Sequence, residues 1–298
     1  METILKSALK TNTLTRTGQS TGGCINQGEA YITDNGTVFV KRNTKSKARL
    51  MFDGEYEGLQ AIAATRTVMV PKPIIVLDNP DGGACLIMEY LNLKGLRKLS
   101  HQLGKDLAHL HLYNISLSNQ SNESGEEYIS QFGFQTTTCC GYIPQDNSWQ
   151  EDWVSFFAQN RLDYQFKLLE KNKRDQEANE LWSRLKIILP NFFKGLKVFP
   201  SLLHGDLWSG NAAETVTSPV IFDPATFYGH HEYDLAIAGM FGGFSQDFYE
   251  AYHKIIPKSE GFESRQKLYQ LFHYLNHWNH FGSGYKSSSI SIMKKLLK

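Results

Sequence analysis

The residues best suited to chemistry lie in one short stretch of the C-terminal half. His204 to Asn211 reads His-Gly-Asp-Leu-Trp-Ser-Gly-Asn, and Asp223 follows twelve residues later. An aspartate with an asparagine five positions on is the spacing with which phosphoryl-transfer sites accept a hydroxyl proton and hold a magnesium ion. A second aspartate after the next strand can add another oxygen ligand. The pattern predicts Asp206 as a catalytic base and Asn211 and Asp223 as magnesium ligands.

These polar residues are flanked by short apolar runs. Leu202 and Leu203 precede them, and residues 220–222 (Val-Ile-Phe) lie just before Asp223. Both runs read as buried strands, which predicts polar side chains at loop positions flanking a sheet. Gly-Asp alone is more often an ordinary turn. A turn, however, does not account for the asparagine and the second aspartate.

A nucleotide site of this kind also needs a cation that holds phosphates, and the N-terminal third offers Lys41. Asp34-Asn35-Gly36 between two β-prone runs, 30–33 and 38–41, predicts a hairpin that ends at this lysine. The glycine-rich stretch that begins at Gly22 and Gly23 could cover phosphates with its backbone amides, although it does not follow the pattern G-x-G-x-x-G. Taken alone, Lys41 would more often be a solvated strand end.

The elements around Lys41 predict its partners. Residues 47–65 have helical composition, and Glu55 on that helix is the expected partner of the lysine ammonium, with Glu57 as the competitor. Apolar runs at 74–77 and 85–88 predict two further strands. Glu89, Tyr90 and Leu91 follow directly, where the hinge of a two-lobed kinase would bind the adenine edge.

Leucine-rich stripes at three- and four-residue spacing predict helices over 96–110, 162–169, 181–188 and 268–278. The predicted fold class is α+β, with residues 1–91 as a nucleotide-binding lobe and 92–298 as a mostly helical catalytic and substrate lobe.

His273, His277 and His280 recur on one side of the last helix, so a metal site has to be considered. No carboxylate completes an H-E-x-x-H pattern, which favours packed or substrate-facing histidines.

The composition excludes several classes of function. In the 298 residues, 31 Lys and Arg face 30 Asp and Glu, so the net charge of +1 provides no field that would attract nucleic acid. The longest weakly polar run, 235–244, is too short to span a bilayer. Four cysteines without zinc-ligand spacing indicate a reducing compartment. Residues 1–16 suit a first helix better than a transit peptide, so we expect a cytoplasmic protein, with a mitochondrial location as the alternative.

Assembled, these motifs resemble the fructosamine-3-kinase family, and within it the ketosamine-3-kinase branch. The resemblance covers the whole chain and is carried by Gly22–Cys24, Val38–Lys41, Cys139–Tyr142, His204–Asn211, Asp223-Pro224 and Tyr274–Phe281. It implies the two-lobed, protein-kinase-like fold of aminoglycoside and choline kinases. No A-P-E element follows Asp223, which argues against a protein kinase.

The resemblance also implies a reaction. ATP would phosphorylate the sugar 3-hydroxyl of a ketosamine on a glycated protein or of a free ketosamine, with Mg²⁺ as the metal, and Trp208 would pack against the sugar. The phosphorylated adduct then decomposes and frees the lysine, so the activity amounts to deglycation. Ribulosamine, psicosamine, fructosamine and erythrulosamine stay open as substrates. The alternatives are a kinase for a small alcohol such as an aminoglycoside or choline, and a pseudokinase scaffold.

Cys24 lies in the glycine-rich stretch, where an exposed thiol near bound phosphate would be open to oxidation. We therefore hypothesise redox control through Cys24, with the protein a monomer or a redox-sensitive homodimer. An unreactive loop thiol is the alternative.

Overall fold

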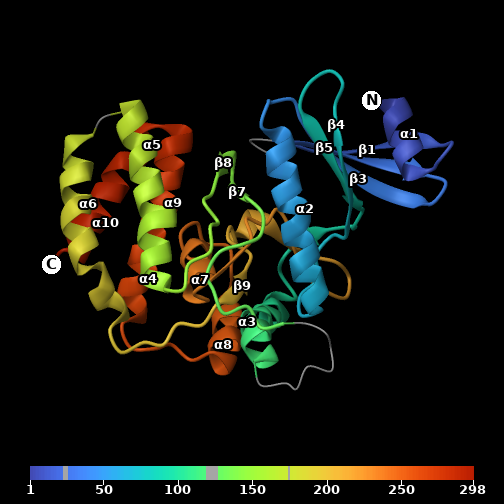
Figure 1. Ribbon diagram of the computed structural model, residues 1–298. Coiled ribbons are helices and arrows are strands. Elements are labelled where there is room, and N and C mark those ends of the chain that lie inside the picture. Colours follow the sequence, from blue (N-terminus) through green and yellow to red (C-terminus); the bar gives the residue numbers. More distant parts are fainter. Residues whose placement is uncertain (23–25, 119–126, 174) are drawn as a thin grey trace.

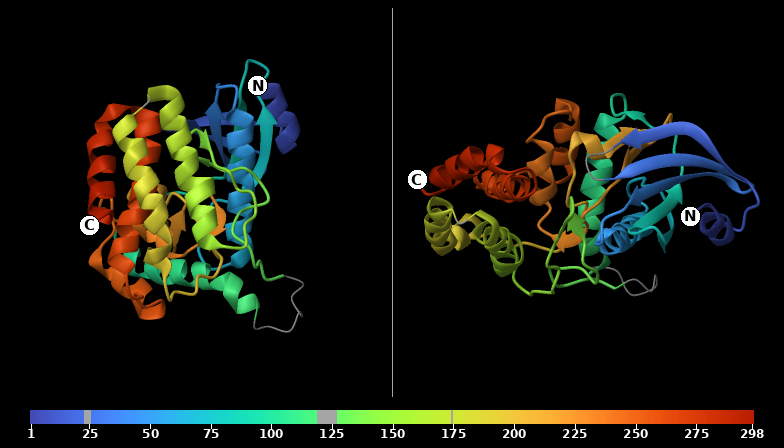
Figure 2. Two further views of the ribbon diagram at one scale, coloured as in Figure 1. Left: turned by 60° about the vertical axis from the view of Figure 1, so that its left-hand side comes forward. Right: turned by 90° about the horizontal axis from the view of Figure 1, so that it is seen from above.

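The computed structural model describes residues 1–22, 26–118, 127–173 and 175–298. It has the predicted α+β, two-lobed architecture. Figure 1 shows a β-sheet with helix α2 (Ala48–Thr65) at one end of the molecule and a group of long helices at the other. The view from above in Figure 2 keeps these two parts at opposite ends.

The N-terminal lobe is built on a five-stranded antiparallel sheet in the order β1-β2-β3-β5-β4. Its elements besides α2 are α1 (Glu2–Leu9), β1 (Leu14–Gly22), β2 (Gln27–Thr33), β3 (Gly36–Asn43), β4 (Pro73–Asp78) and β5 (Ala84–Glu89). The predicted hairpin is present, with Thr33 opposite Gly36. Strand β1 was not predicted, because its sequence LTRTGQSTG lacks apolar alternation.

The period of two along β3 explains where Lys41 points. Val38 and Val40 pack with Leu5 of α1 in a small core on one face of the sheet. The alternate residue Phe39 packs on the main core, to which α2 contributes. Because successive side chains of a strand point to opposite faces, Lys41 shares the face of Phe39 and meets α2.

The C-terminal lobe is mostly helical. Its helices are α3 (Ser100–Leu117), α4 (Trp153–Phe156), the π-helical turn η1 (Phe157–Asp163), α5 (Tyr164–Lys173), α6 (Gln176–Ile188), η2 (Leu189–Phe193), η3 (Ser209–Asn211), α7 (Glu232–Ala238), α8 (Gln246–Ile255), α9 (Phe262–Phe281), η4 (Ser283–Tyr285) and α10 (Lys286–Leu296). Helices α5, α6, α9 and α10 pack together at the end opposite the sheet (Figure 1). All four predicted helical stripes fall on helices, although Leu96 and Leu99 precede α3.

The short strands of this lobe form three small sheets. Its strands are β6 (Lys94–Gly95), β7 (Cys139–Cys140), β8 (Ile143–Pro144), β9 (Ser201–Leu203), β10 (Ala212–Glu214), β11 (Pro219–Ile221) and β12 (Phe227–Gly229). The two buried strands predicted on either side of the polar loop are present as β9 and β11, but they belong to different sheets. β9 pairs with β12, whereas β11 pairs with β10. The unpredicted strands β10 and β12 take the partner positions, so the polar loop joins two separate sheets.

Helix α2 lies very close to the C-terminal lobe. A Cβ atom at Gly54 would lie 2.4 Å from the carbonyl oxygen of Thr137, and one at Gly58 would lie 2.7 Å from Thr226 Oγ1. The two glycines therefore allow the helix to rest directly on loops of the other lobe. The main hydrophobic core is likewise continuous, since it includes buried residues of α2 and of α9.

The division at residue 91 stays a prediction. Strand β5 ends at Glu89, and β6 joins a small sheet of the C-terminal lobe. Among the described residues, no helix is both long and apolar enough to cross a membrane.

Candidate active site

Lys41, Glu55 and Asp223 meet at the junction of the two lobes. The Lys41 ammonium donates hydrogen bonds to both carboxylate oxygens of Glu55, at 2.6 and 2.7 Å, and to Asp223 Oδ1 at 2.9 Å. Glu55, rather than Glu57, is thus the helix partner of the lysine, as predicted. Lys41 and Glu55 have only 7% and 8% of their side chains exposed, whereas Asp223 has 44%. The carboxylate of Asp223 therefore remains open to a ligand.

Burial alone would lower the pKa of the Lys41 ammonium. The negative charges of Asp223 and Glu55, together with their hydrogen bonds, outweigh this effect and raise its pKa. Lys41 is consequently positively charged at any physiological pH. A fixed, buried cation with one solvent-facing carboxylate beside it is suited to binding a metal-bound triphosphate.

Asp206 and Asn211 lie on the loop that leaves β9. The amide nitrogen of Asn211 donates to the backbone oxygen of Asp206 at 2.9 Å and approaches its carboxylate oxygen Oδ2 at 3.4 Å. Gly205, immediately before, has φ +83°, and a Cβ there would lie 2.1 Å from the carbonyl oxygen of Ala225. Glycine is required at this turn because both its conformation and the space exclude a side chain.

The environment of Asp206 brings the pKa of its carboxyl close to neutral pH. Burial raises the pKa of its carboxyl to about 7, and the charges of Asp223 and Asp234 act in the same direction, while the Asn211 hydrogen bond lowers the pKa. A carboxylate with a pKa near the working pH accepts a proton more effectively than an ordinary aspartate. The arrangement suits Asp206 to general-base chemistry.

His204 ties the two chemical loops together. Its Nε2 lies 2.9 Å from the carbonyl oxygen of Phe222, so it must carry the proton, and Nδ1 then accepts the backbone N–H of Asp206 at 3.2 Å. Burial lowers the pKa of His204, which keeps the ring neutral. The loop of Asp206 and the loop of Asp223 therefore form one hydrogen-bonded unit.

Asp234 at the start of α7 is a residue that sequence reasoning missed. Its fully buried carboxylate accepts the backbone N–H groups of His204 and Gly205 at 2.7 and 2.8 Å, and its Oδ2 lies 3.2 Å from His111 Nε2. Burial would raise the pKa of Asp234, but the His111 hydrogen bond reverses the effect and lowers it. The sequence around Asp234 does not predict this role, because Asp234 lies thirty positions after His204, whose backbone N–H it accepts.

The donor set fits a magnesium ion. Asn211 uses its N–H₂ group toward Asp206, so its amide oxygen is turned away from that bond. Asp223 has φ +59°, a left-handed conformation that holds its partly exposed carboxylate beside Lys41. Carboxylate and amide oxygens are what a hard divalent cation prefers. Strained backbone at a residue of this kind is typical of functional sites.

Trp208 lies on the same loop with 38% of its surface exposed. Its indole covers Gly210, since a Cβ there would lie 2.2 Å from the ring. The centroid of the Trp208 ring lies 6.0 Å from that of Phe241, and the centroid of the Phe241 ring lies 5.4 Å from that of His277. These rings form an aromatic wall next to the loop of Asp206.

The remaining predicted residues are placed less completely. The backbone N–H of Glu89 donates to the carbonyl oxygen of Lys72 at 2.8 Å, and adenine binding by Glu89, Tyr90 and Leu91 stays a prediction. Gly22 ends β1 opposite Gln27. Gly23 and Cys24 lie outside the described residues, so redox control through Cys24 stays a prediction.

The sequence model of the fructosamine kinase family matches residues 1–298. The ketosamine-3-kinase of Mus musculus is 54% identical over 309 residues, which span 100% of both chains. The chloroplastic protein-ribulosamine 3-kinase of Arabidopsis thaliana is 41% identical over 290 residues, covering 97% of this chain and 85% of that protein.

Solved structures agree on the fold. A crystal structure from Haemophilus somnus 129PT, assigned as a fructosamine-3-kinase, superposes with a TM-score of 0.81 at 25% identity over 99% of this chain and 96% of the other. The aminoglycoside phosphotransferase APH(2″)-IIa, in a ternary complex with streptomycin and ATP, superposes with a TM-score of 0.61 at 14% identity over 99% and 95%.

Proposed function

The chain belongs to the fructosamine kinase family, and we propose that it is an ATP-dependent ketosamine 3-kinase. The identity of 54% to a ketosamine-3-kinase over the whole length supports the substrate class more than any other observation. The contact of Lys41 with Glu55 and Asp223, beside Asp206 and Asn211, supports the reaction class. The acceptor is an alcohol group of the substrate.

Each residue has one task in the proposed mechanism. Lys41 binds phosphate oxygens of ATP, and Glu55 fixes its ammonium. Asn211 and Asp223 would hold Mg²⁺, which when bound neutralises charge on the phosphates. Asp206 orients the 3-hydroxyl of the sugar and accepts its proton as the oxygen attacks. Trp208 and the aromatic wall beside it pack against the sugar ring.

The product explains the biological use of such a reaction. Phosphate on the sugar is a better leaving group than hydroxide, and it stands beside a ketoamine that can enolise. Elimination of phosphate then lets the adduct decompose and frees the amine of a protein lysine. We propose that glycated proteins and free ketosamines are the substrates, and that the enzyme deglycates proteins in the cytoplasm, with mitochondria as the alternative location.

Kinases of aminoglycosides or choline share the fold but are the less favoured candidates. An aminoglycoside would call for an acidic pocket and choline for an aromatic cage. The aromatic wall of Trp208, Phe241 and His277 could stack on a sugar as well as on a cation, so the wall does not separate the two. The identity to a ketosamine-3-kinase and to a protein-ribulosamine 3-kinase favours a ketosamine as the substrate over choline or an aminoglycoside.

The test is ATP consumption with ribulosamine, psicosamine, erythrulosamine and fructosamine derivatives of lysine, and with choline and kanamycin as controls. We expect turnover of at least one ketosamine and phosphate on its C3 oxygen, located by NMR. Turnover confined to choline or kanamycin would replace the proposal with the alternative kinase. Nucleotide binding without transfer to any acceptor would indicate a pseudokinase scaffold.

The oligomeric state and the role of Cys24 remain proposals of their own. A monomer and a redox-sensitive homodimer are distinguished by sizing the protein with and without reductant. Equal activity of oxidised and reduced protein would remove Cys24 from regulation.

A further inference from the structure

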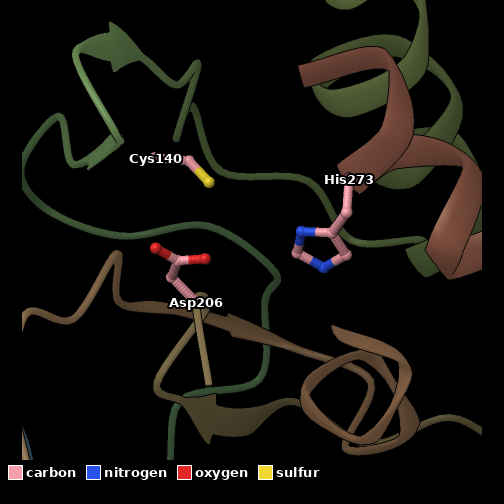
Figure 3. Close-up of side chains that lie close together, drawn as sticks. All are labelled: Cys140, Asp206 and His273. Carbon is pink, nitrogen blue, oxygen red and sulfur yellow. The ribbon is translucent and has the colours of Figure 1, made fainter. Parts of the chain in front are cut away.

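Three metal-binding side chains from distant parts of the chain meet next to the proposed base. The sulfur of Cys140, a carboxylate oxygen of Asp206 and a ring nitrogen of His273 all lie within 4.8 Å of one another. Figure 3 shows the sulfur, the carboxylate and the imidazole turned toward one common space. They come from β7, from the loop after β9 and from α9, so sequence spacing gives no hint of the group.

His273 is a buried histidine whose polar atoms are not satisfied. Its side chain is fully buried, and neither ring nitrogen has a hydrogen-bond partner among the described residues. The rings of Tyr233 and Phe272 pack around it, each with its centroid 5.1 Å away. A buried polar group without a partner destabilises the fold, so a ligand that satisfies it is to be expected. Burial lowers the pKa of His273 to about 3, which leaves the ring neutral.

Cys140 is held in place by a hydrogen bond to its sulfur as well as by packing. Asn276 donates from Nδ2 to its sulfur at 3.2 Å, and Gln165 in turn donates to the amide oxygen of Asn276 at 3.1 Å. Such a chain fixes the direction of the sulfur and stabilises a thiolate. Metal sites characteristically have outer partners that orient each ligand in this way.

A buried positive charge close by would be a partner for a metal-bound thiolate. Arg161 in the π-helical turn is fully buried between the rings of Phe156 and Phe227. Its guanidinium donates to the backbone oxygen of Asp146 and to the amide oxygen of Asn147, which carry no charge. Burial raises the pKa of the Cys140 thiol well above its usual range and the charge of Asp206 acts in the same direction, while the charge of Arg161 opposes both. A thiolate formed at Cys140 would give this cation a neighbouring counter-charge.

We propose that Cys140, His273 and Asp206 form a binding site for a thiophilic divalent ion of the zinc class, and that this ion inhibits the kinase by occupying its base. Sulfur, imidazole and carboxylate are a zinc donor set, and three protein ligands leave a fourth position for water. On binding, the Cys140 thiol releases its proton to solvent and the sulfur bonds to the metal. The inhibition rests on the proposed function, whereas the binding does not.

The site is distinct from the magnesium ligands. Asn211 and Asp223 offer only oxygen, which suits a hard cation, while Cys140 and His273 offer the softer donors that Mg²⁺ avoids. The three-histidine idea from α9 is also not the arrangement found, because Nδ1 of His277 and of His280 each lie 2.7 Å from a backbone carbonyl. The neighbouring group His230, His231 and Glu232 is already satisfied by Tyr269, Tyr252 and Arg265.

Cobalt provides a readout that needs neither ATP nor a ketosamine. The wild-type protein, without nucleotide, is titrated with Co²⁺ under a non-chelating reductant and its absorption spectrum recorded. We expect a thiolate-to-cobalt charge-transfer band and the visible bands of tetrahedral cobalt, displaced by one equivalent of Zn²⁺. Cys140→Ser should abolish the charge-transfer band, and His273→Gln should weaken binding strongly, while the adjacent Cys139→Ser should leave the spectrum unchanged.

Two quantitative arms complete the test. Asn276→Ala should weaken cobalt binding by about 10–100-fold, the effect of losing a residue that orients a ligand. In the kinase assay with excess Mg²⁺ and ATP, Zn²⁺ should inhibit the wild type and the Cys139→Ser variant at equal concentrations, and Cys140→Ser should require at least tenfold more. Circular dichroism and thermal melting check that each variant is folded.

The absence of a sulfur band in the wild type, or its persistence in Cys140→Ser, would overturn the site. Zinc inhibition that is equal in wild type and Cys140→Ser would place the inhibitory ion at the magnesium ligands instead. If no ketosamine is phosphorylated but the band behaves as expected, the proposed function fails and the metal site stands.

Discussion

Lys41 Nζ and Asp223 Oδ1 lie 2.9 Å apart, although 182 positions of sequence separate the two residues. One comes from the sheet of the N-terminal lobe and the other from a loop of the C-terminal lobe. The contact therefore joins the two lobes at the place where a metal-bound triphosphate would bind. Because the fold itself holds this ion pair, the phosphates of ATP would bind beside a cation that is already oriented.

Replacing Lys41 by Met should lower nucleotide-dependent turnover by about 10²-fold or more, as expected when a charge that stabilises the transition state is lost. It should also destabilise the fold by about 3–5 kcal/mol, because Glu55 is left buried without its partner. Lys47→Met, six residues on, is the control. Adding Glu55→Leu to Lys41→Met should restore the free energy of unfolding without restoring turnover; recovery of activity would remove Lys41 from phosphate binding.

Asp206→Asn should lower kcat by about 10²–10⁴-fold, the range of general-base contributions, while the Kd for ATP changes little. The amide keeps the shape of the side chain and one oxygen, but it cannot take a proton. Isothermal titration with a nonhydrolysable nucleotide checks binding, and steady-state kinetics check turnover. An undiminished kcat would exclude Asp206 as the base.

The pH dependence of kcat/KM follows from the raised pKa of Asp206. The base must be ionised, so kcat/KM of the free enzyme should fall as the pH drops through about 7, rather than near the ordinary aspartate value. Bound Mg²⁺ next to Asp223 should shift this fall in kcat/KM to lower pH.

The raised pKa of Asp206 also means that its ionised carboxylate lowers the free energy of unfolding. Asp206→Asn should therefore have the higher melting temperature at pH 8, with the difference vanishing below about pH 4.

Asp234→Asn should loosen the catalytic loop without touching the substrate. The carboxylate accepts two backbone N–H groups of that loop, and charge-assisted hydrogen bonds contribute about 1.5–3 kcal/mol. We expect a comparable loss of unfolding free energy and at least about tenfold lower kcat, a factor that about 1.4 kcal/mol at the transition state would produce. Asp247→Asn, on the exposed first turn of α8, should change neither. Unchanged kcat in Asp234→Asn would show that its role is confined to folding.

Gly54→Ala and Gly58→Ala separate a rigid clash from a movable one. Alanine at Gly54 would meet the backbone of Thr137 and Thr138, whereas alanine at Gly58 would meet the side chain of Thr226, with Oγ1 at 2.7 Å and Cβ at 3.0 Å. Overpacking costs about 1–3 kcal/mol, which exceeds the gain of about 1 kcal/mol from Gly to Ala in a helix. Gly54→Ala should therefore be the more destabilising and reduce turnover. Gly239→Ala, where the nearest atom is 3.7 Å away, is the control.

The sequence predicted those parts of the molecule in which local pattern and chemistry coincide. The hairpin to Lys41 and the helix of Glu55 have strong local signals, and a lysine on the α2 face of β3 follows from strand periodicity. Strand β1 was not predicted because its sequence, LTRTGQSTG, is mostly polar and lacks apolar alternation. The contacts of Asp234 with the loop of His204, and the grouping of Cys140 with Asp206 and His273, were not predicted for a different reason. Each depends on side chains brought together by tertiary packing, and a single sequence without such contacts does not place them.

The close packing of α2 on the C-terminal lobe has a consequence for control. In kinases that are switched by swinging this helix, the lysine–glutamate pair forms and breaks as the helix moves. Here Gly54 and Gly58 leave α2 wedged against the carbonyl of Thr137 and the hydroxyl of Thr226, with Glu55 next to the tightest point. The Lys41–Glu55 pair is thus already assembled in the resting fold, and we expect no swing of α2 to be needed to complete it.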